Sequence, residues 1–234
     1  MTSRRTAFHN AVFWDVDTQA DFMLPGGRLY ARGAEMIIPN LERLTRYARL
    51  HHLLVIASAD AHQPDDPEFS QWPPHCLAGT PGQQKLKQTR LAPAYVLPAM
   101  PASLPEDLSA FRQIVVEKRS VDVFDNPNIE ALLAKLHTGV PGEPDFGSLR
   151  QKPEVTVYGV VTEVCVGLAV QGLLKRGYQV RIVTDAIRAL SDQAGEHTLA
   201  QLSAQGARLV TTDDVGRGLA LPQAAGEADS SLRS

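Results

Sequence analysis

Residues 155–177, VTVYGVVTEVCVGLAVQGLLKRG, constrain the fold more than any other stretch. The stretch opens with apolar and β-branched residues bounded by Pro153, a pattern that predicts a buried strand. After a short turn over residues 160–163, apolar residues recur every three or four positions until Gly177, which predicts a helix. A strand that leads directly into a helix is the repeating unit of α/β proteins.

Cys165 lies where this strand ends and the helix begins. Unpaired backbone N–H groups and the positive end of a helix dipole would both favour a thiolate at that position. The alternative is a small apolar residue packed under the turn, because free cysteines are among the most buried residue types. The position alone therefore leaves open whether Cys165 is a nucleophile or a packing residue.

Strand and helix patterns alternate along the rest of the chain. Strands are predicted at residues 11–17, 53–57, 114–116, 155–159, 180–183 and 209–211, and further helices at 39–47, 126–136 and 192–205. This alternation predicts βαβ units, right-handed crossovers and a mainly parallel sheet with helices on both faces. In such sheets ligands bind outside the carboxyl ends of the strands.

Chemically competent side chains follow four of the predicted strands. Asp17 ends the first, Asp60 and His62 follow the second, Lys118 ends the third and Cys165 follows the fourth. Because the carboxyl ends of parallel strands meet at one edge of the sheet, we expect these groups to lie together. The sequence therefore predicts a functional site at that edge.

The chemistry that these groups favour is nucleophilic acyl transfer. Asp17 is the candidate base for the Cys165 thiol, and Lys118 is the candidate cation beside the thiolate. The backbone N–H groups of Val161 and Cys165 are candidate donors to an oxyanion. Each residue also has a structural interpretation: a strand-end Asp often caps a turn, and Lys118 fits a solvated charge. Taken together, the residues favour the acyl-transfer site.

A second cluster, Asp60, His62, Glu68 and His75, has the ligand types of a metal site. Asp60 and His62 leave one strand end, while Glu68 and His75 lie in the polar, Pro-rich segment 62–82. Carboxylate and imidazole ligands suit Zn, with Mn or Fe as alternatives, rather than Ca. The irregular spacing also fits a loop whose polar groups only bond to one another.

Several neighbouring residues leave this assignment open. Asp65 and Asp66 compete with Glu68 as ligands, and Cys76 is either a ligand or a packed thiol. Phe22 and Trp72 suit stacking on a flat substrate ring, although core packing is the commoner use of such side chains.

Composition places the chain in a broad class. With 234 residues, 44% hydrophobic and 21% charged, it predicts one domain over residues 11–221, between an N-terminal tail, 1–10, and a disordered tail, 222–234. Residues 138–153 form a Gly/Pro-rich excursion. A net charge of −3 argues against nucleic acid or an anionic membrane as partner, and no apolar run reaches membrane-spanning length. Two cysteines do not make a disulfide framework, which predicts a cytoplasmic protein.

The motifs together resemble the isochorismatase-like cysteine hydrolases and, within them, the nicotinamidases. The resembling motifs are DTQADF from Asp17, DAH from Asp60, WPPHC from Trp72, GTPG from Gly79, the lysine at 118, and GVVTEVCV from Gly159. The resemblance runs from about residue 11 to residue 190. It identifies Asp17 as the family's catalytic base, Lys118 as its lysine and Cys165 as its nucleophile.

The resemblance implies further properties. It implies a Rossmann-like three-layer fold with a six-stranded sheet, a homo-oligomer, a cysteine thioester and a cis peptide between Val160 and Val161. It also implies one divalent transition metal held by residues matching Asp60, His62 and His75, with Glu68 where many members have a histidine. The chain departs from the family pattern at Ala20, at Val164 and in residues 138–153.

The leading functional hypothesis is a metal-containing amidase that converts nicotinamide to nicotinate and ammonia. The alternative enzyme is a metal-independent amidohydrolase that acts on another small amide, a ureido acid or a carbamoyl compound. A non-catalytic small-molecule binding module is the alternative of another class, and the intact set of Asp17, Lys118 and Cys165 argues against it. An isochorismatase proper is disfavoured because such enol-ether hydrolases do not need the cysteine.

Overall fold

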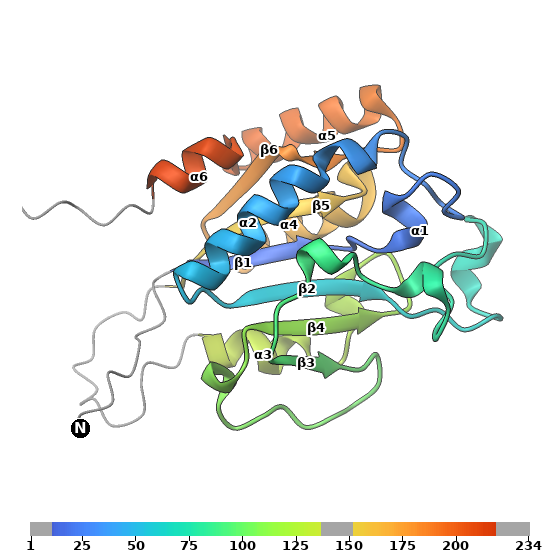
Figure 1. Cartoon of the computed structure of the whole chain (residues 1–234), viewed down its shortest axis with the longest axis horizontal. Helices are drawn as coiled ribbons and strands as arrows, with labels where there is room; N and C mark the ends of the chain where they lie inside the picture. The colour runs from blue at the N-terminus through green and yellow to red at the C-terminus, as the bar shows by residue number, and fades with distance from the viewer. Residues whose placement is uncertain (1–10, 137–151, 219–234) are drawn as a thin grey trace, which may run out of the picture.

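A computed structural model of the chain describes residues 11–136 and 152–218 (Figure 1). Its centre is a seven-stranded sheet in the order β3-β4-β2-β1-β5-β6-β7, and all paired strands run parallel. The strands are β1 (Ala11–Val16), β2 (Val55–Asp60), β3 (Ala94–Leu97), β4 (Gln113–Lys118), β5 (Glu154–Val160), β6 (Val180–Arg188) and β7 (Arg208–Val210). The predicted mainly parallel α/β architecture is confirmed.

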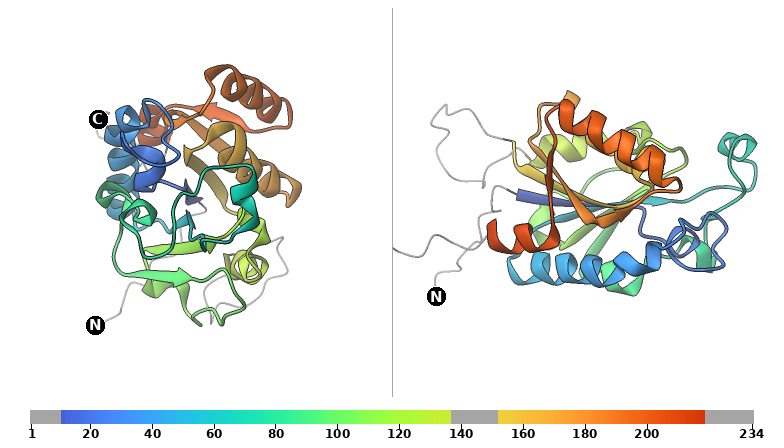
Figure 2. Two further views of the ribbon diagram at one scale, coloured as in Figure 1. Left: turned by 90° about the vertical axis from the view of Figure 1, so that its right-hand side faces the viewer. Right: turned by 90° about the horizontal axis from the view of Figure 1, so that it is seen from above.

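Helices cover both faces of this sheet, which gives three layers (Figure 2). Helices α2 and α6 lie on one face, and α3, α4 and α5 lie on the other. The helices are α1 (Ala20–Met23), α2 (Ile38–Leu50), α3 (Ile129–Leu136), α4 (Gly167–Lys175), α5 (Asp192–Ala204) and α6 (Thr212–Gly218).

Two apolar cores, one on each face, hold the layers together. Strand β1 shows the division: Trp14 and Val16 pack into one core, while Phe13 packs into the other. Successive side chains of a strand point to opposite faces, so a strand covered on both sides is buried along its length. All six residues of β1 are indeed buried. The central strands are therefore rigid supports for whatever follows their carboxyl ends.

The sheet has one strand more than the six that the sequence predicts. The additional strand, β3, is a four-residue edge strand between Pro93 and Pro98, with Ala94 and Val96 exposed. Proline is confined to strand edges because it cannot donate a ladder hydrogen bond, and here the flanking prolines obscured the strand signal. Helix α6 was also not predicted, since the sequence TDDVGRG is polar and contains two glycines.

Helix α3 begins at Ile129, so the predicted start at residue 126 is wrong. Asn126 and Asn128 are used instead as side-chain braces. Asn126 Nδ2 donates to the carbonyl of Glu117 at 2.7 Å, and Asn128 Nδ2 donates to that of Met100 at 2.8 Å. Asparagine side chains that bond to backbone compete with helix formation. The Asn126 bond fixes the end of β4, where the site residue Lys118 lies.

Three sequence predictions fall outside the described residues: the tail 1–10, nearly all of the excursion 138–153, and the tail 222–234. In the described part of the chain, no helix combines the length and apolar content needed to cross a bilayer.

Candidate active site

The carboxyl ends of three neighbouring strands place a carboxylate, another carboxylate and an amine side by side. Asp17 follows β1, Asp60 ends β2, and Lys118 ends β4 directly opposite Asp60 in the strand register. All three are at most 2% exposed. The register of parallel strands therefore fixes their relative positions, as the sequence predicted.

Lys118 bridges the groups at this edge. Its Nζ lies 3.1 Å from Asp17 Oδ2 and 3.8 Å from Cys165 Sγ, and it also forms an ion pair with Asp60 Oδ1. Asp17 Oδ1 accepts a hydrogen bond from Ser58 at 2.6 Å. We refer to Asp17, Lys118 and Cys165 as the nucleophile group.

Burial controls the protonation of the nucleophile group. It raises the pKa of the Cys165 thiol well above its usual value, although Lys118 acts in the opposite direction. Burial likewise raises the pKa of Asp17, again against the attraction of Lys118. Burial alone would lower the pKa of Lys118, but Asp17 and Asp60 outweigh it and hold that pKa well above the ordinary range. The resting thiol is therefore neutral, and beside it the Lys118 ammonium is paired with Asp17 and Asp60.

The turn that carries Cys165 differs from the predicted helix start. Residues Thr162–Val166 form a π-helical segment, η7, and α4 begins only at Gly167. The expectation that a helix terminus favours the thiolate is outweighed by burial, since Cys165 is only 7% exposed. The peptide between Val160 and Val161 is cis, as the resemblance implied. Gly159 allows β5 to approach β1, because a Cβ there would lie 2.0 Å from the carbonyl oxygen of Val16.

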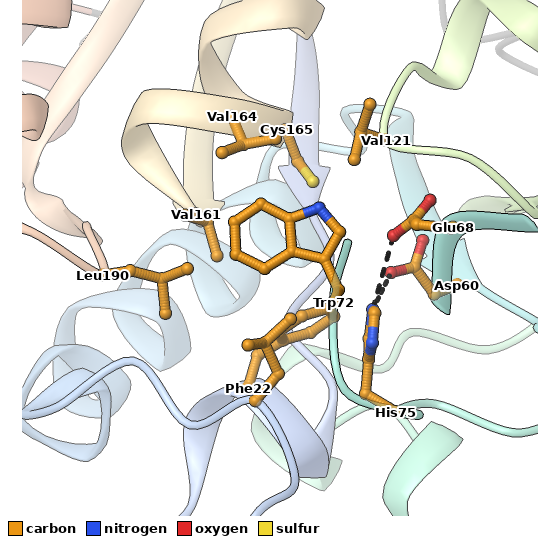
Figure 3. Close-up of a pocket in the computed structure, with 11 residues that line it drawn as sticks. Phe22, Asp60, Glu68, Trp72, His75, Val121, Val161, Val164, Cys165 and Leu190 are labelled. Carbon is orange, nitrogen blue, oxygen red and sulfur yellow. Dashed lines mark ion pairs between the residues drawn. The ribbon is translucent and has the colours of Figure 1, made fainter. Parts of the chain in front are cut away.

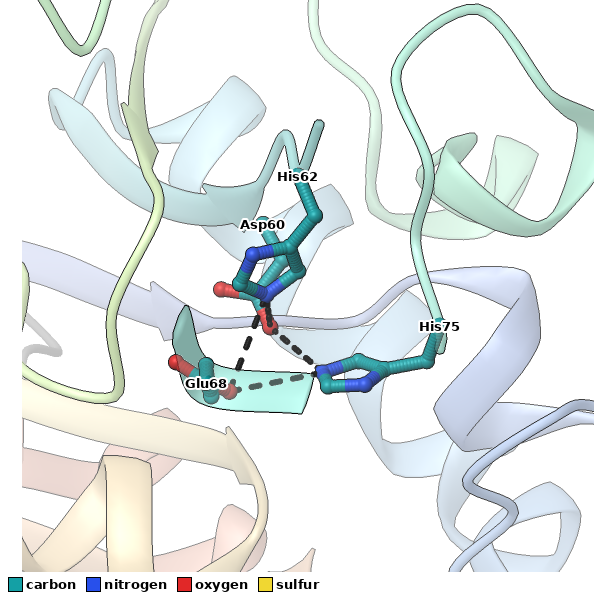
Figure 4. A group of neighbouring side chains, drawn as sticks. All are labelled: Asp60, His62, Glu68 and His75. Atoms are coloured by element: carbon teal, nitrogen blue, oxygen red, sulfur yellow. Dashed lines mark ion pairs between the residues drawn. The ribbon is translucent and has the colours of Figure 1, made fainter. Parts of the chain in front are cut away.

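Beside the nucleophile group, four side chains converge on one point (Figure 4). Asp60, His62, Glu68 and His75 each offer one ligand atom, and these atoms lie within 4.8 Å of one another. His75 Nε2 lies 3.3 Å from Asp60 Oδ2 and 3.7 Å from Glu68 Oε1; His62 Nε2 lies 3.6 and 3.7 Å from the same atoms. We refer to these four residues as the metal group.

The hydrogen bonds of the two imidazole rings leave the metal group suited to bind a transition metal. His75 Nδ1 is engaged by the carbonyl of Pro73 at 2.8 Å, and His62 Nδ1 by Asp66 at 3.0 Å. Each acceptor holds the ring proton on Nδ1 and leaves Nε2 free to bind a metal, the usual outer-sphere arrangement. Within the described residues, buried His62 Nε2 has no hydrogen-bond partner. The four separations between a carboxylate oxygen and an imidazole nitrogen, 3.3–3.7 Å, are short enough for these atoms to share one ion with bonds near about 2.1 Å.

The other candidate ligands of this loop do not join the group. Asp65 is exposed, whereas Asp66 is buried and bonds to the outer nitrogen of His62. Cys76 packs in an apolar core, and burial raises the pKa of its thiol far above the usual range. Among the alternatives that the sequence left open, Glu68 is thus the carboxylate that faces the histidines.

Two residues after β1, Gln19 and Asp21, support the metal group through hydrogen bonds to the backbone. The sequence did not reveal them as site residues. Gln19 is fully buried; it accepts from the N–H of Asp60 at 2.7 Å and donates to the carbonyl of the same residue at 2.8 Å. Asp21 accepts from the N–H of Cys76, next to His75, at 2.7 Å. Their alternation with Asp17 is the only sequence signal for this role.

A narrow cavity of about 10 Å³ lies between the two groups (Figure 3). Cys165 lies on one side, and Asp60, Glu68 and His75 lie on the other. The Trp72 indole lies across the space, with Phe22 below it, so the predicted ring-binding residues do line the cavity. The remaining lining residues, most of which the sequence did not reveal, are Leu29, Val121, Val161, Val164 and Leu190.

Comparison with known sequences agrees with this architecture. The sequence profile described as the Isochorismatase domain matches residues 15–214. The chain is 27% identical over 206 residues to the nicotinamidase/pyrazinamidase of Mycobacterium tuberculosis, covering 83% of this chain and 95% of that protein. It is 26% identical over 223 residues to the nicotinamidase of Escherichia coli, covering 85% and 93%.

Solved structures show the same fold. The pyrazinamidase of Pyrococcus horikoshii in complex with zinc superposes with a TM-score of 0.65 at 22% identity, over 87% of this chain and 99% of that one. The N-carbamoylsarcosine amidase of Thermoplasma acidophilum superposes with a TM-score of 0.64 at 22% identity, over 87% and 96%. The two neighbours differ in the substrates their names give, so the fold alone does not choose a substrate.

Proposed function

The chain belongs to the isochorismatase family, and from that premise we propose that it is a cysteine amidohydrolase that converts nicotinamide to nicotinate and ammonia. One observation carries the proposal. A single cavity has a buried thiol, paired with a carboxylate and an ammonium, on one side and a group of metal-ligand types on the other. In this proposal a small ring with a carboxamide binds between the two sides, with the carboxamide toward Cys165 and the ring toward the metal-ligand group.

The first step is a proton transfer. Because burial raises the pKa of the Cys165 thiol, the nucleophile does not form on its own and needs a base. Burial also raises the pKa of Asp17, which makes its carboxylate a better base for the thiol. Asp17 takes the proton from Sγ while the ammonium of Lys118, 3.8 Å away, stabilises the sulfur anion.

The thiolate then attacks the carboxamide carbon and forms a C–S bond. The carbonyl oxygen becomes an oxyanion, for which the backbone N–H groups of Val161 and Cys165 are the proposed donors. Protonated Asp17 returns its proton to the nitrogen, the C–N bond breaks and ammonia leaves. Water, deprotonated by Asp17, hydrolyses the thioester to the carboxylic acid and restores the thiol.

Asp60, His62, Glu68 and His75 would hold one divalent metal, for which zinc is the best fit to two imidazoles and two carboxylates. When bound, the metal would supply a fixed point for the ring nitrogen of the substrate and so orient its carboxamide toward Cys165. Phe22 and Trp72 hold the ring between them by aromatic contact.

Without a bound metal, the charges around the cavity favour a neutral substrate. Among the described residues that line it, two are carboxylates, Asp60 and Glu68, and none is a lysine or arginine. A ureido acid would bring its carboxylate into this cavity without a cation to pair with, which is costly in a buried site. The alternative of a metal-independent enzyme for ureido acids is therefore disfavoured, and neutral carbamoyl compounds remain the competing substrates.

The test is ammonia release from a matched panel of amides. Nicotinamide and pyrazinamide carry the ring nitrogen, benzamide lacks it, and N-carbamoylsarcosine is an acidic ureido compound. We expect turnover to be highest with nicotinamide, lower with benzamide and lowest with N-carbamoylsarcosine. Equal rates for benzamide and nicotinamide would contradict the orienting role of the metal, and preference for N-carbamoylsarcosine would contradict the proposed substrate.

A further inference from the structure

We propose that Arg119, a half-exposed residue outside the cavity, is a positioning residue for the metal group that acts through Asp66 on His62. The inference rests on the proposed metal site and extends it to a residue that contacts neither metal ligand atoms nor substrate. Arg119 directly follows Lys118 at the end of β4. The end of β4 therefore places Lys118 in the nucleophile group and Arg119 beside the metal group.

A chain of side-chain contacts joins Arg119 to His62. Arg119 Nε donates to Asp66 Oδ2 at 3.1 Å, and its Nη2 is paired with Asp66 Oδ1. Asp66 Oδ2 also receives His62 Nδ1 at 3.0 Å and the backbone N–H of Gln63 at 2.9 Å. The guanidinium thus makes a bidentate interaction with both carboxylate oxygens. A planar guanidinium provides this geometry, whereas a lysine ammonium does not.

The contrast with His75 shows why His62 needs this support. The outer nitrogen of His75 bonds to a backbone carbonyl, that of Pro73, which the chain itself holds in place. The outer nitrogen of His62 bonds to a side chain, which must itself be held. The Asp66 side chain is 1% exposed and the Arg119 side chain 47% exposed, so the support for a buried ligand reaches the surface.

The guanidinium is also the cation that balances a buried carboxylate, because it contacts both oxygens of the Asp66 side chain, which is 1% exposed. A buried carboxylate that loses its cation either turns toward water or changes partners. Either response removes the fixed acceptor from His62 Nδ1 and lets the imidazole ring leave its orientation toward the other ligands.

A positioning role and a purely electrostatic role of Arg119 predict opposite changes in zinc affinity when Arg119 is removed. If Arg119 acted only as a positive charge near a bound cation, its removal would tighten zinc binding. If it positions Asp66 and His62, its removal weakens zinc binding, because the loss of outer-sphere partners typically costs 10- to 100-fold in metal affinity.

The experiment is a zinc competition titration against a chromophoric chelator, carried out on the full chain without substrate. We expect Arg119→Met to weaken zinc binding by about 10-fold or more, and Arg119→Lys, which keeps the charge without the fork, to weaken it as well. Asp66→Asn should also weaken binding. Adding Arg119→Met to Asp66→Asn should cost little more, because the two residues act through one contact.

Two matched controls separate this role from general damage. Arg176→Met removes another surface arginine paired with a carboxylate, that of Glu130, away from the metal group. Asp65→Asn makes the same change as Asp66→Asn at the exposed neighbouring residue. Both controls should bind zinc as the wild type does, and thermal unfolding of all variants checks that they are folded.

The outcomes distinguish this inference from the proposal on which it rests. A wild-type chain that binds no zinc would contradict the metal site itself. A wild-type chain that binds zinc, with Arg119→Met equal or tighter and Arg119→Lys unchanged, would overturn only the positioning role of Arg119. Weaker binding that is fully additive with Asp66→Asn would also overturn it, because Arg119 would then act by another route.

Discussion

The nucleophile group and the metal group share one cavity but are built by different means. Asp17 follows β1, Lys118 ends β4 and Cys165 lies in the turn after β5, and all three are buried. In the metal group only Asp60 ends a strand; the other ligands come from the irregular segment 62–82. The difference teaches that sheet geometry is sufficient to place a nucleophile, whereas a loop-borne ligand needs its own hydrogen bonds.

Side chains outside the metal group supply those bonds. Gln19 holds the backbone of Asp60, Asp21 holds the N–H of Cys76 beside His75, and Asp66 holds His62. Gly82 is required in the same loop, because a Cβ there would lie 2.2 Å from the Asp21 carboxylate. The loop is thus ordered by a set of buried polar contacts, each with a direct consequence for one ligand.

The largest effect should come from the strand-built group. Cys165→Ala removes the atom that forms the covalent intermediate, so we expect kcat for nicotinamide hydrolysis to fall by about 10⁴-fold or more. Zinc binding should be unchanged, because the thiol is not among the ligand atoms. Ammonia release and zinc titration measure the two. A variant with near-normal turnover would refute the thioester mechanism.

A smaller loss of kcat is expected from Asp17→Asn and Lys118→Met. These two variants also test the ion pair between Lys118 and Asp60, which connects the nucleophile group to the metal group. Each should lower kcat by about 100-fold or more, in the range of general acid–base residues. Lys118→Met alone leaves two buried carboxylates, Asp17 and Asp60, without their cation. It should therefore cost about 3–5 kcal/mol of stability in urea unfolding, as breaking a buried pair does.

Asp17→Asn is the matched comparison, since it removes one charge and keeps the shape. Its stability loss should be clearly smaller than that of Lys118→Met. Equal losses would mean that the link between Lys118 and Asp60 contributes nothing and that the two groups are independent. A change confined to KM would place the altered residue in substrate binding instead of proton transfer.

The loop-built group should have a more selective effect. Removing metal with a chelator, or changing His62→Ala, should lower kcat/KM for nicotinamide by about 100-fold or more, because the carboxamide is no longer positioned against Cys165. Alkylation of Cys165 by iodoacetamide should stay within about 2-fold, because the metal orients the substrate and does not generate the nucleophile. Nicotinamide turnover that survives both treatments would favour the metal-independent amidohydrolase.

The same difference explains how much could be predicted. The strand patterns placed Asp17, Asp60 and Lys118 at one edge, because residues after parallel strands must meet there. The edge strand β3 was missed because it is short, half exposed and flanked by prolines. For Cys165 the position was right, but the strength of burial against the helix terminus was visible only in three dimensions.

The metal group was less accessible to sequence reasoning. The ligand types suggested a site, but the choice of Glu68 over Asp65 and Asp66 depends on side-chain directions in an irregular loop. The support from Arg119 could not be predicted at all, since it joins the end of β4 to a loop that lies more than fifty positions earlier in the chain. No periodic pattern records such a contact.

The smallest predicted effect concerns the hydrogen bonds that support the metal group. It is tested by comparing two buried glutamines, Gln19 and Gln113, which bond to different backbone groups. Gln19 bonds to both backbone groups of Asp60 and to the carbonyl of Gln83, whereas Gln113 accepts from the N–H of Leu91 at 3.1 Å and donates to the carbonyl of Thr89 at 2.9 Å. Gln19→Ala and Gln113→Ala each leave backbone groups without partners, at about 1–3 kcal/mol for each buried group. Both should therefore destabilise the protein in urea unfolding, Gln19→Ala somewhat more because it frees three backbone groups and Gln113→Ala frees two. Only Gln19→Ala should also weaken zinc binding and raise KM for nicotinamide, by a few-fold, because only Gln19 holds a metal-group residue. If both variants changed zinc binding equally, the effect would reflect lost stability, and the loop would not depend on the individual contacts of Gln19.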